Sequence, residues 1–150
     1  MNAFRALTTA LLLCCAAPVL AQGTNVAFGA ITQDTSLPVE VTADNLAVDQ
    51  SSGTAVFTGN VMIGQGEMRL TAARVLVTYR SQNAGIAKLE ATGGVTLVTG
   101  ADAAESERAD YNIDSGEIEM SGNVLLTQGS SALTAEKMFV NLRDGTARMS

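Results

Sequence analysis

The sequence has no histidine and no tryptophan, and its two cysteines, Cys14 and Cys15, are adjacent near the N-terminus. Without histidine no serine–histidine–aspartate triad can be built, and after residue 15 the histidine and cysteine ligands of zinc sites are missing. Carboxylates remain, but Asp49, Asp114 and Asp144 lie beside turn glycines, where aspartate has a local backbone role. We therefore predict no enzymatic activity, no cofactor and no metal site.

Long hydrophobic runs are also absent after the first 21 residues. These residues have the pattern of a secretory signal peptide: Arg5 supplies one positive charge, an apolar run follows, and Val19 and Ala21 suit signal peptidase. The run is too short for a stable membrane anchor. We expect cleavage of residues 1–21 and an exported mature protein that begins at Gln22 and has no disulfide.

Positive charge is scarce in the mature chain. Without Arg5, eight basic and fifteen acidic residues give a formal charge of −7, which argues against a nucleic-acid binder because such proteins neutralise phosphates. Residues 22–36 are predicted to be a flexible N-terminal segment. Residues 37–150 are long enough for one domain with its own core.

What the sequence does contain is an internal repeat. Its units start at 42, 71, 105 and 134, spaced 29, 34 and 29 residues apart: Thr42–Asn45, Thr71–Arg74, the degenerate Glu105–Arg108, and Thr134–Lys137. A turn glycine follows the start by 11 residues in three units and by 14 in the second, where Thr78–Gly85 predicts a larger loop.

A second mark follows each of the first three turn glycines: Gly59–Val61, Gly93–Val95 and Gly122–Val124. Between the marks apolar and polar residues alternate, and turn signals bound each run, which predicts β-strands. Most turns are short enough to join antiparallel neighbours as hairpins. The repeated unit is therefore a pair of strands.

The first strand of each unit contains a phase slip. The alternation through Leu70 and Ala72 resumes at Val75 and Val77, one residue late. An extra residue moves side chains to the other face unless the strand bends, so each slip predicts a bulge or corner. Stacked corners give an all-β fold of two antiparallel sheets that enclose an apolar space, a jelly-roll-like or rolled sandwich built from repeated two-strand units. A parallel β-helix is the alternative, which the short turns disfavour.

Three segments resemble a known family: Leu37–Asp44, Val56–Val61 with the following Gln65–Gly66, and Leu70–Thr78. They are similar to the periplasmic lipopolysaccharide-transport bridge proteins of the OstA-like (LptA) family, and the likeness covers nearly all of the mature chain. The resemblance implies an open β-jelly roll that holds the acyl chains of lipopolysaccharide in its interior. The sequence departs from relatives after Gly145, where it lacks their hydrophilic tail.

The resemblance also implies a location and partners. Family members stack head-to-tail in the periplasm. With the bitopic inner-membrane component and the N-terminal domain of the outer-membrane translocon, they form a bridge. In the family, apolar residues of the first strand after the proline contact lipid and partner, and these match Val39 and Val41 here.

The remaining inward apolar positions are candidates for lipid contact. They are Leu46, Val48, Phe57, Val61, Ile63, Val75, Val77, Leu89, Val95, Leu97, Ile113, Met120, Val124 and Leu126. Alternating apolar faces usually form a dry core, and that interpretation stays open. The few aromatic residues, 4% of the chain, leave little bulk for a dry core, and methionine adapts to irregular ligands.

The fourth position of the repeat reads Asn45, Arg74, Arg108 and Lys137. Three cations are thus predicted in one column along a sheet edge, as candidate contacts for lipid A phosphates or for an acidic partner. The alternative is a solvated ladder paired with Glu107 and Glu136, because exposed ion pairs are common and weak.

The predicted function is that of a periplasmic lipopolysaccharide-binding bridge protein. It would shield the acyl chains and pass lipopolysaccharide from the inner to the outer membrane. Two alternatives stay open. One is a structural adaptor whose strand edges pair with partner domains around a dry core, and the other is a carrier of another periplasmic lipid.

Overall fold

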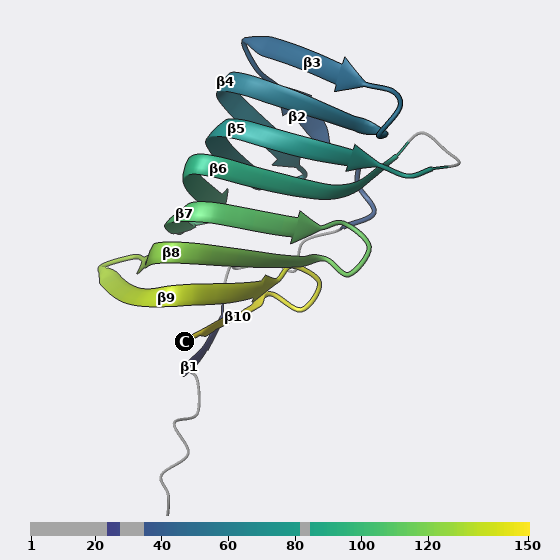
Figure 1. The fold of residues 1–150 in the computed structure, drawn as a ribbon. Coiled ribbons are helices and arrows are strands. Elements are labelled where there is room, and N and C mark those ends of the chain that lie inside the picture. The colour runs from purple at the N-terminus through teal and green to yellow at the C-terminus, as the bar shows by residue number, and fades with distance from the viewer. Residues whose placement is uncertain (1–23, 28–34, 82–84) are drawn as a thin grey trace, which may run out of the picture.

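A computed structural model describes residues 24–27, 35–81 and 85–150 (Figure 1). The predicted signal peptide lies outside these residues, as does part of the predicted loop Thr78–Gly85. No helix in the described ranges is long and apolar enough to cross a membrane.

The described residues form one ten-stranded sheet in which every neighbouring pair is antiparallel. Its strands are β1 (Thr24–Ala27), β2 (Glu40–Thr42), β3 (Asn45–Asp49), β4 (Thr54–Gln65), β5 (Met68–Tyr79), β6 (Ile86–Thr99), β7 (Asp102–Asn112), β8 (Glu117–Gln128), β9 (Ser131–Asn141) and β10 (Thr146–Met149). The order across the sheet is β1-β10-β9-β8-β7-β6-β5-β4-β2, and β3 also pairs with β4. The prediction of an all-β antiparallel fold is confirmed.

Each of the long strands β4 to β9 bends where the register shifts, at a place we call the corner. In the pairing of β4 with β5, for example, the register shifts between Thr58 and Val61. Gly59 and Asn60 lie in this gap with φ of 79° and 46°, and Gly93–Gly94 and Gly122–Asn123 occupy the same place in β6 and β8. The phase slips in the sequence therefore correspond to real corners.

The corner divides the continuous sheet into two layers. The first layer contains β1, β3, β10 and the strand halves Thr54–Thr58, Arg74–Tyr79, Ile86–Thr92, Arg108–Asn112, Glu117–Ser121 and Lys137–Asn141. The second contains β2 and the halves Val61–Gln65, Met68–Ala72, Val95–Thr99, Asp102–Glu105, Val124–Gln128 and Ser131–Ala135. The two predicted sheets are thus the two halves of one folded sheet, stacked as rungs in Figure 1.

The core lies between the layers because alternate residues of every long strand point inward. Ile63 and Leu97 enter it from the second layer, and Val77 and Ile118 enter it from the first. Side chains of both layers form one buried apolar cluster, so the layers hold each other by contact along their inner faces.

Part of the segment 22–36, which the sequence predicts to be flexible, is described in the structure. Thr24–Ala27 form β1, which pairs with β10 in register from Thr24 opposite Met149 to Ala27 opposite Thr146. An edge strand such as β10 offers unpaired backbone donors and acceptors. A short strand from elsewhere in the chain can satisfy them, which local composition does not reveal.

The corner makes a prediction about stability. At Gly93 a Cβ atom would lie 2.7 Å from the Cβ atom of Ala73, whereas at Gly94 it would meet nothing within 4 Å. Both glycines have positive φ, near 85°. We expect Gly94→Ala to lower the free energy of unfolding by about 1 kcal/mol through backbone strain alone. Gly93→Ala should cost about 1–3 kcal/mol more because it adds a clash. Urea unfolding of both variants measures the difference, and equal losses would contradict the packing we describe.

Candidate functional site

Most of the apolar residues predicted to line the interior are buried there. Ten of them are at most 2% exposed: Val61, Ile63, Val75, Val77, Leu89, Val95, Leu97, Met120, Val124 and Leu126. Val39, Val41, Phe57 and Ile113 are half-buried and pack against the same cluster. The interior is thus one continuous apolar surface that runs from β2 and β3 towards β10.

Two of the predicted interior residues are instead exposed. Leu46 is 57% and Val48 is 62% exposed, although they lie directly opposite Phe57 and Ala55 of β4 and so share their inward face. Among the described residues β3 pairs only with β4, so nothing described beyond it covers these side chains. The expectation that they are enclosed is wrong for the described residues, because no described strand lies beyond β3.

The interior also contains a polar pair that the sequence analysis missed. Gln65 and Tyr111 are each 1% exposed, and the Tyr111 hydroxyl donates a hydrogen bond to Gln65 Oε1. Gln65 ends the second-layer half of β4, and Tyr111 lies one residue from the end of β7 in the first layer. Their bond therefore joins the two layers at the side opposite the corner, which we call the mouth.

A short stretch of backbone, which we call the strap (Thr35–Leu37), lies on this polar pair. Gln65 Nε2 donates to the carbonyl oxygens of Thr35, at 3.0 Å, and of Leu37, at 2.9 Å. Arg143 Nε donates to Thr35 Oγ1 at 3.3 Å, and the same guanidinium donates to the carbonyl oxygen of Asp114. The strap thus contacts side chains of both layers across the mouth.

The polar pair was detectable in the sequence. Gln65 continues the inward alternation of Val61 and Ile63, and Tyr111 continues that of Ala109. A glutamine on the inward side of a strand needs buried hydrogen-bond partners, but their identity depends on contacts far along the chain. Burial raises the pKa of Tyr111 to about 12, so the neutral hydroxyl is the form that the interior accepts.

The predicted column of cations is present. Asn45, Thr58, Arg74, Thr92, Arg108, Ser121 and Lys137 lie opposite one another in a single row across β3 to β9. The row lies beside the corner and faces outward, since the next residue after Arg74, Val75, is buried. The predicted place along a sheet edge is therefore wrong: the register puts the row across the strands.

The partners of these cations also differ from the prediction. Arg108 pairs with Asp110 at 2.9 Å and with Glu90 at 3.0 Å, and these carboxylates, Asp110 above all, raise the pKa of Arg108. Lys137 pairs with Glu119 at 3.4 Å. These acids form the neighbouring row of the same face, two residues farther from the corner on each strand. Glu107 instead accepts a hydrogen bond from Asn123.

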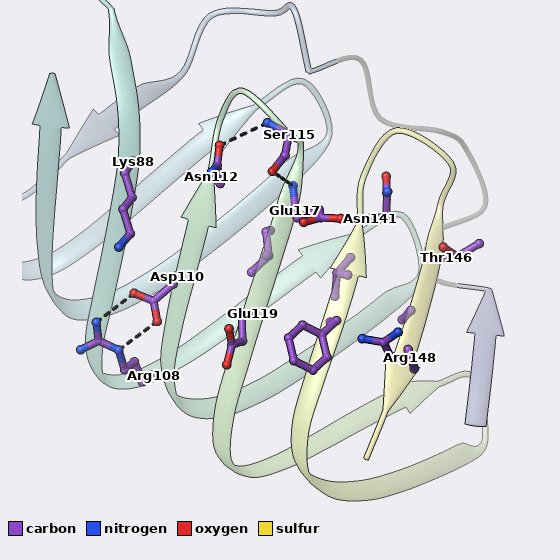
Figure 2. A pocket seen from close by; sticks show the side chains of 14 residues that line it. Lys88, Arg108, Asp110, Asn112, Ser115, Glu117, Glu119, Asn141, Thr146 and Arg148 are labelled. Carbon is purple, nitrogen blue, oxygen red and sulfur yellow. Dashed lines mark hydrogen bonds and ion pairs between the residues drawn. The ribbon is translucent and has the colours of Figure 1, made fainter. Parts of the chain in front are cut away.

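The outer face of the first layer is hollowed between β6 and β10, as Figure 2 shows. The hollow, about 740 Å³, is lined by charged and amide side chains. The Arg148 guanidinium lies 5.0 Å from the centre of the Phe139 ring. This surface is too polar for acyl chains, so the apolar interior is the candidate lipid site. In the part of the chain that the structure describes, no group of acidic residues is arranged to hold a metal ion.

Comparison with known proteins agrees with this fold and interior. Residues 40–146 match the family described as LptA/(LptD N-terminal domain) LPS transport protein. The chain belongs to this family. The match begins at β2 and ends at the start of β10, so it covers both layers and every corner.

Several curated proteins are similar to this chain over part of its length. An uncharacterized protein of Rhizobium meliloti (strain 1021) is 30% identical over 105 residues, which are 65% of this chain and 56% of that protein. The lipopolysaccharide export system protein LptA of Escherichia coli (strain K12) is 37% identical over 49 residues, 33% of this chain and 26% of that protein. The matched regions thus span about half and about a quarter of these relatives.

A solved structure has the same fold. It is LptH of Pseudomonas aeruginosa, named as the LptA homologous periplasmic component of the conserved lipopolysaccharide transport device. It superposes with a TM-score of 0.70 and 18% identity, over 79% of this chain and 85% of that chain. The jelly-roll fold predicted for this member of the LPS transport family is therefore confirmed.

The buried pair predicts a change in alkaline stability. The pKa of Tyr111 is higher in the folded protein, about 12, than the ordinary value of about 10 in an unfolded chain. Its contribution to stability is therefore complete below about pH 10 and is lost as the pH rises towards 12. We expect Tyr111→Phe to remove this part of the pH dependence and to cost about 1–2 kcal/mol at pH 7, since Gln65 Oε1 loses its donor. Urea unfolding at pH 7 and from pH 9 to 12 measures both effects. If the free energy of unfolding of the variant falls with pH as steeply as that of the wild type, Tyr111 is not the group responsible.

Proposed function

We propose that this protein is a periplasmic component of lipopolysaccharide transport that encloses the acyl chains and passes the lipid from the inner to the outer membrane. The observation that carries the proposal is the continuous apolar inner face within a domain of the LPS transport family. Exposed acyl chains cannot cross an aqueous gap easily, because each methylene removed from water is worth about 0.8 kcal/mol. An apolar interior removes that obstacle without covalent chemistry.

The sheet order supports the entry of lipid between the layers. Backbone hydrogen bonds run from strand to neighbouring strand along one path. In the described ranges the two layers are joined by backbone only through the corners, and across the mouth they meet through side chains and the strap. The layers can therefore part by bending at the corner with the ladder intact, and acyl chains then replace contacts between the layers.

The open end of the roll supports transfer to a neighbouring domain. Leu46 and Val48 extend the inner face beyond the enclosed core, and β3 pairs with described residues on one side only. A strand of a similar domain could pair there and continue the apolar surface. The partners we propose are a second copy placed head-to-tail, the bitopic inner-membrane component and the N-terminal domain of the outer-membrane translocon.

A second candidate is favoured by the close packing of the interior. Its apolar side chains are almost fully buried against each other, as in an adaptor that only pairs with partner domains around a dry core. Such an adaptor never opens. A carrier of another periplasmic lipid would open but would prefer a different lipid.

A photo-crosslinking amino acid at Phe57 or Val95 distinguishes these functions. We expect both inner positions to form ATP-dependent adducts with lipopolysaccharide in cells, because the chains pass the inner face. The matched control is Thr127, which lies outward on the second layer beside buried Leu126, away from the row of Arg108, and should form none. Adducts absent from the inner positions would favour the adaptor, and adducts with another lipid would favour the other carrier.

The outward column gives a separate test of polar contact. We propose that Arg74 and Arg108 contact an acidic partner, because charge-assisted bonds are strong. Lipid A phosphates are the alternative, which requires the headgroup to leave beside the corner and not at the mouth. Arg74 has no ion pair among the described residues, whereas Arg108 already has two. Arg74→Glu combined with Arg108→Glu should weaken lipopolysaccharide or partner binding about tenfold. Arg69→Glu with Arg80→Glu makes the same change of charge elsewhere on the surface. If both double variants bind equally well, the column has no binding role and is only a ladder of solvated charges.

A further inference from the structure

The place of the polar pair in the roll requires an explanation. Gln65 and Tyr111 are almost fully buried in an interior that is otherwise largely apolar. Buried Ser106, by contrast, bonds within its own strand, to the carbonyl oxygen of Arg108. Gln65 and Tyr111 connect opposite layers, and they do so at the mouth. An amphiphile with its chains between the layers must pass its polar head out through this same mouth.

The bonding of Gln65 indicates which chemical groups the site accepts. Its amide nitrogen has two N–H donors, and it donates to two backbone carbonyl oxygens of the strap, those of Thr35 and Leu37. Two neighbouring carbonyl acceptors beside an apolar space also occur at the junction of head and chains in an acylated lipid, where the carbonyls belong to esters or amides. The strap thus presents the acceptors that such a lipid would present.

We propose that Gln65 and Tyr111 form a binding site for the ester or amide carbonyls of an acylated lipid, and that the strap occupies this site when lipid is absent. The inference rests on the proposed function and adds to it the group of the lipid that is recognised. Lipid that enters the mouth displaces the strap and takes over its hydrogen bonds to Gln65. The site therefore keeps the junction of headgroup and acyl chains at the mouth while the chains lie inside.

The contacts of the strap are suited to displacement. Besides the bonds to Gln65, the strap accepts a bond from Arg143 at its exposed surface. Leu37, its largest apolar side chain, is 41% exposed, so part of this side chain already reaches solvent while the strap is in place. The hydrogen bonds from Gln65 are the buried part of the attachment, and Gln65 can donate equivalent hydrogen bonds to lipid carbonyls.

A pair of lipids tests the carbonyl site directly. The probes are diheptanoyl phosphatidylcholine and its dialkyl ether analogue of equal chain length, which lacks both carbonyls, titrated as monomers into residues 22–150. Displacement of the strap is common to both probes, so the carbonyl contact is isolated by comparing the ratio of their dissociation constants in the wild-type protein with the ratio in a variant that lacks the polar pair. We expect the ether to bind about fivefold more weakly than the ester.

The matched variant for this test combines Gln65→Leu with Tyr111→Phe. This variant removes the Gln65 amide and the Tyr111 hydroxyl together, so the loss of one does not leave the other buried without this hydrogen bond. The ratio of the dissociation constants for ether and ester should then fall to about one. Equal affinity of the wild-type protein for ester and ether would overturn the inference, and so would an unchanged ratio in the double variant.

A reversible lock tests the role of the strap with lipopolysaccharide itself. Residues 22–150 contain no cysteine, and a Cβ atom at Gly116 would lie 3.2 Å from Thr35 Cγ2, close enough for a disulfide. In a Thr35→Cys, Gly116→Cys variant, oxidation should abolish lipopolysaccharide binding and reduction should restore it. Gly116→Cys alone controls for strain at the positive φ of 72°.

The outcomes of the two tests separate the inference from the proposed function. If the oxidised and reduced forms bind lipopolysaccharide equally, the strap does not occupy the site, and the inference fails while the function stands. If the wild-type protein binds no lipopolysaccharide, the proposed function fails, and the preference for ester over ether then decides the inference.

Discussion

The structure depends on a single constraint, which is that an unbroken antiparallel ladder must turn through a corner in every long strand. Backbone groups inside a sheet have to stay paired, so each bend is confined to a few residues. In β4, β6 and β8 these have positive φ, as at Gly59, Gly93 and Gly122. Each corner also has to lie directly above the previous one. Otherwise the inner face would lose its register and its apolar residues would turn outward.

Stacked corners have a mechanical consequence. The backbone gives the described roll stiffness along the direction of stacking, because every rung is hydrogen bonded to the next. It gives little resistance to opening at the mouth, where side chains and the strap meet. The proposed entry of acyl chains between the layers needs this combination. The buried bonds of Gln65 and Tyr111 lie where the resistance to opening would otherwise be smallest.

The same geometry separates two kinds of surface. The inner face is apolar, and in the first layer the outer face carries rows of paired charges such as Arg108 with Asp110. Paired and exposed charges contribute little to stability. They keep this face polar, however, and acyl chains bind weakly to a polar surface. The exposed Leu46 and Val48 at the end of the described roll belong to the inner face, so the inner face reaches solvent there.

The sequence by itself determined the repeat, the strands, the corners and most of the inner face. Each of these follows from local periodicity: alternation places Val77 and Leu97 inward, and a one-residue slip has no other outcome in a sheet than a bend. It also predicted the row of Arg74, Arg108 and Lys137, because residues at one position of a repeat fall at one place in a stack.

The tertiary structure decided the rest, since it depends on pairings between distant segments. The partners of Arg108 follow from the strand register, and the exposure of Leu46 depends on which strand ends the described sheet. The strap and β1 join the roll through contacts with segments far along the chain, as the hydrogen bond between Arg143 and Thr35 shows. Periodicity could place Gln65 inward, but only the folded chain brings Tyr111 and the strap carbonyls to its amide.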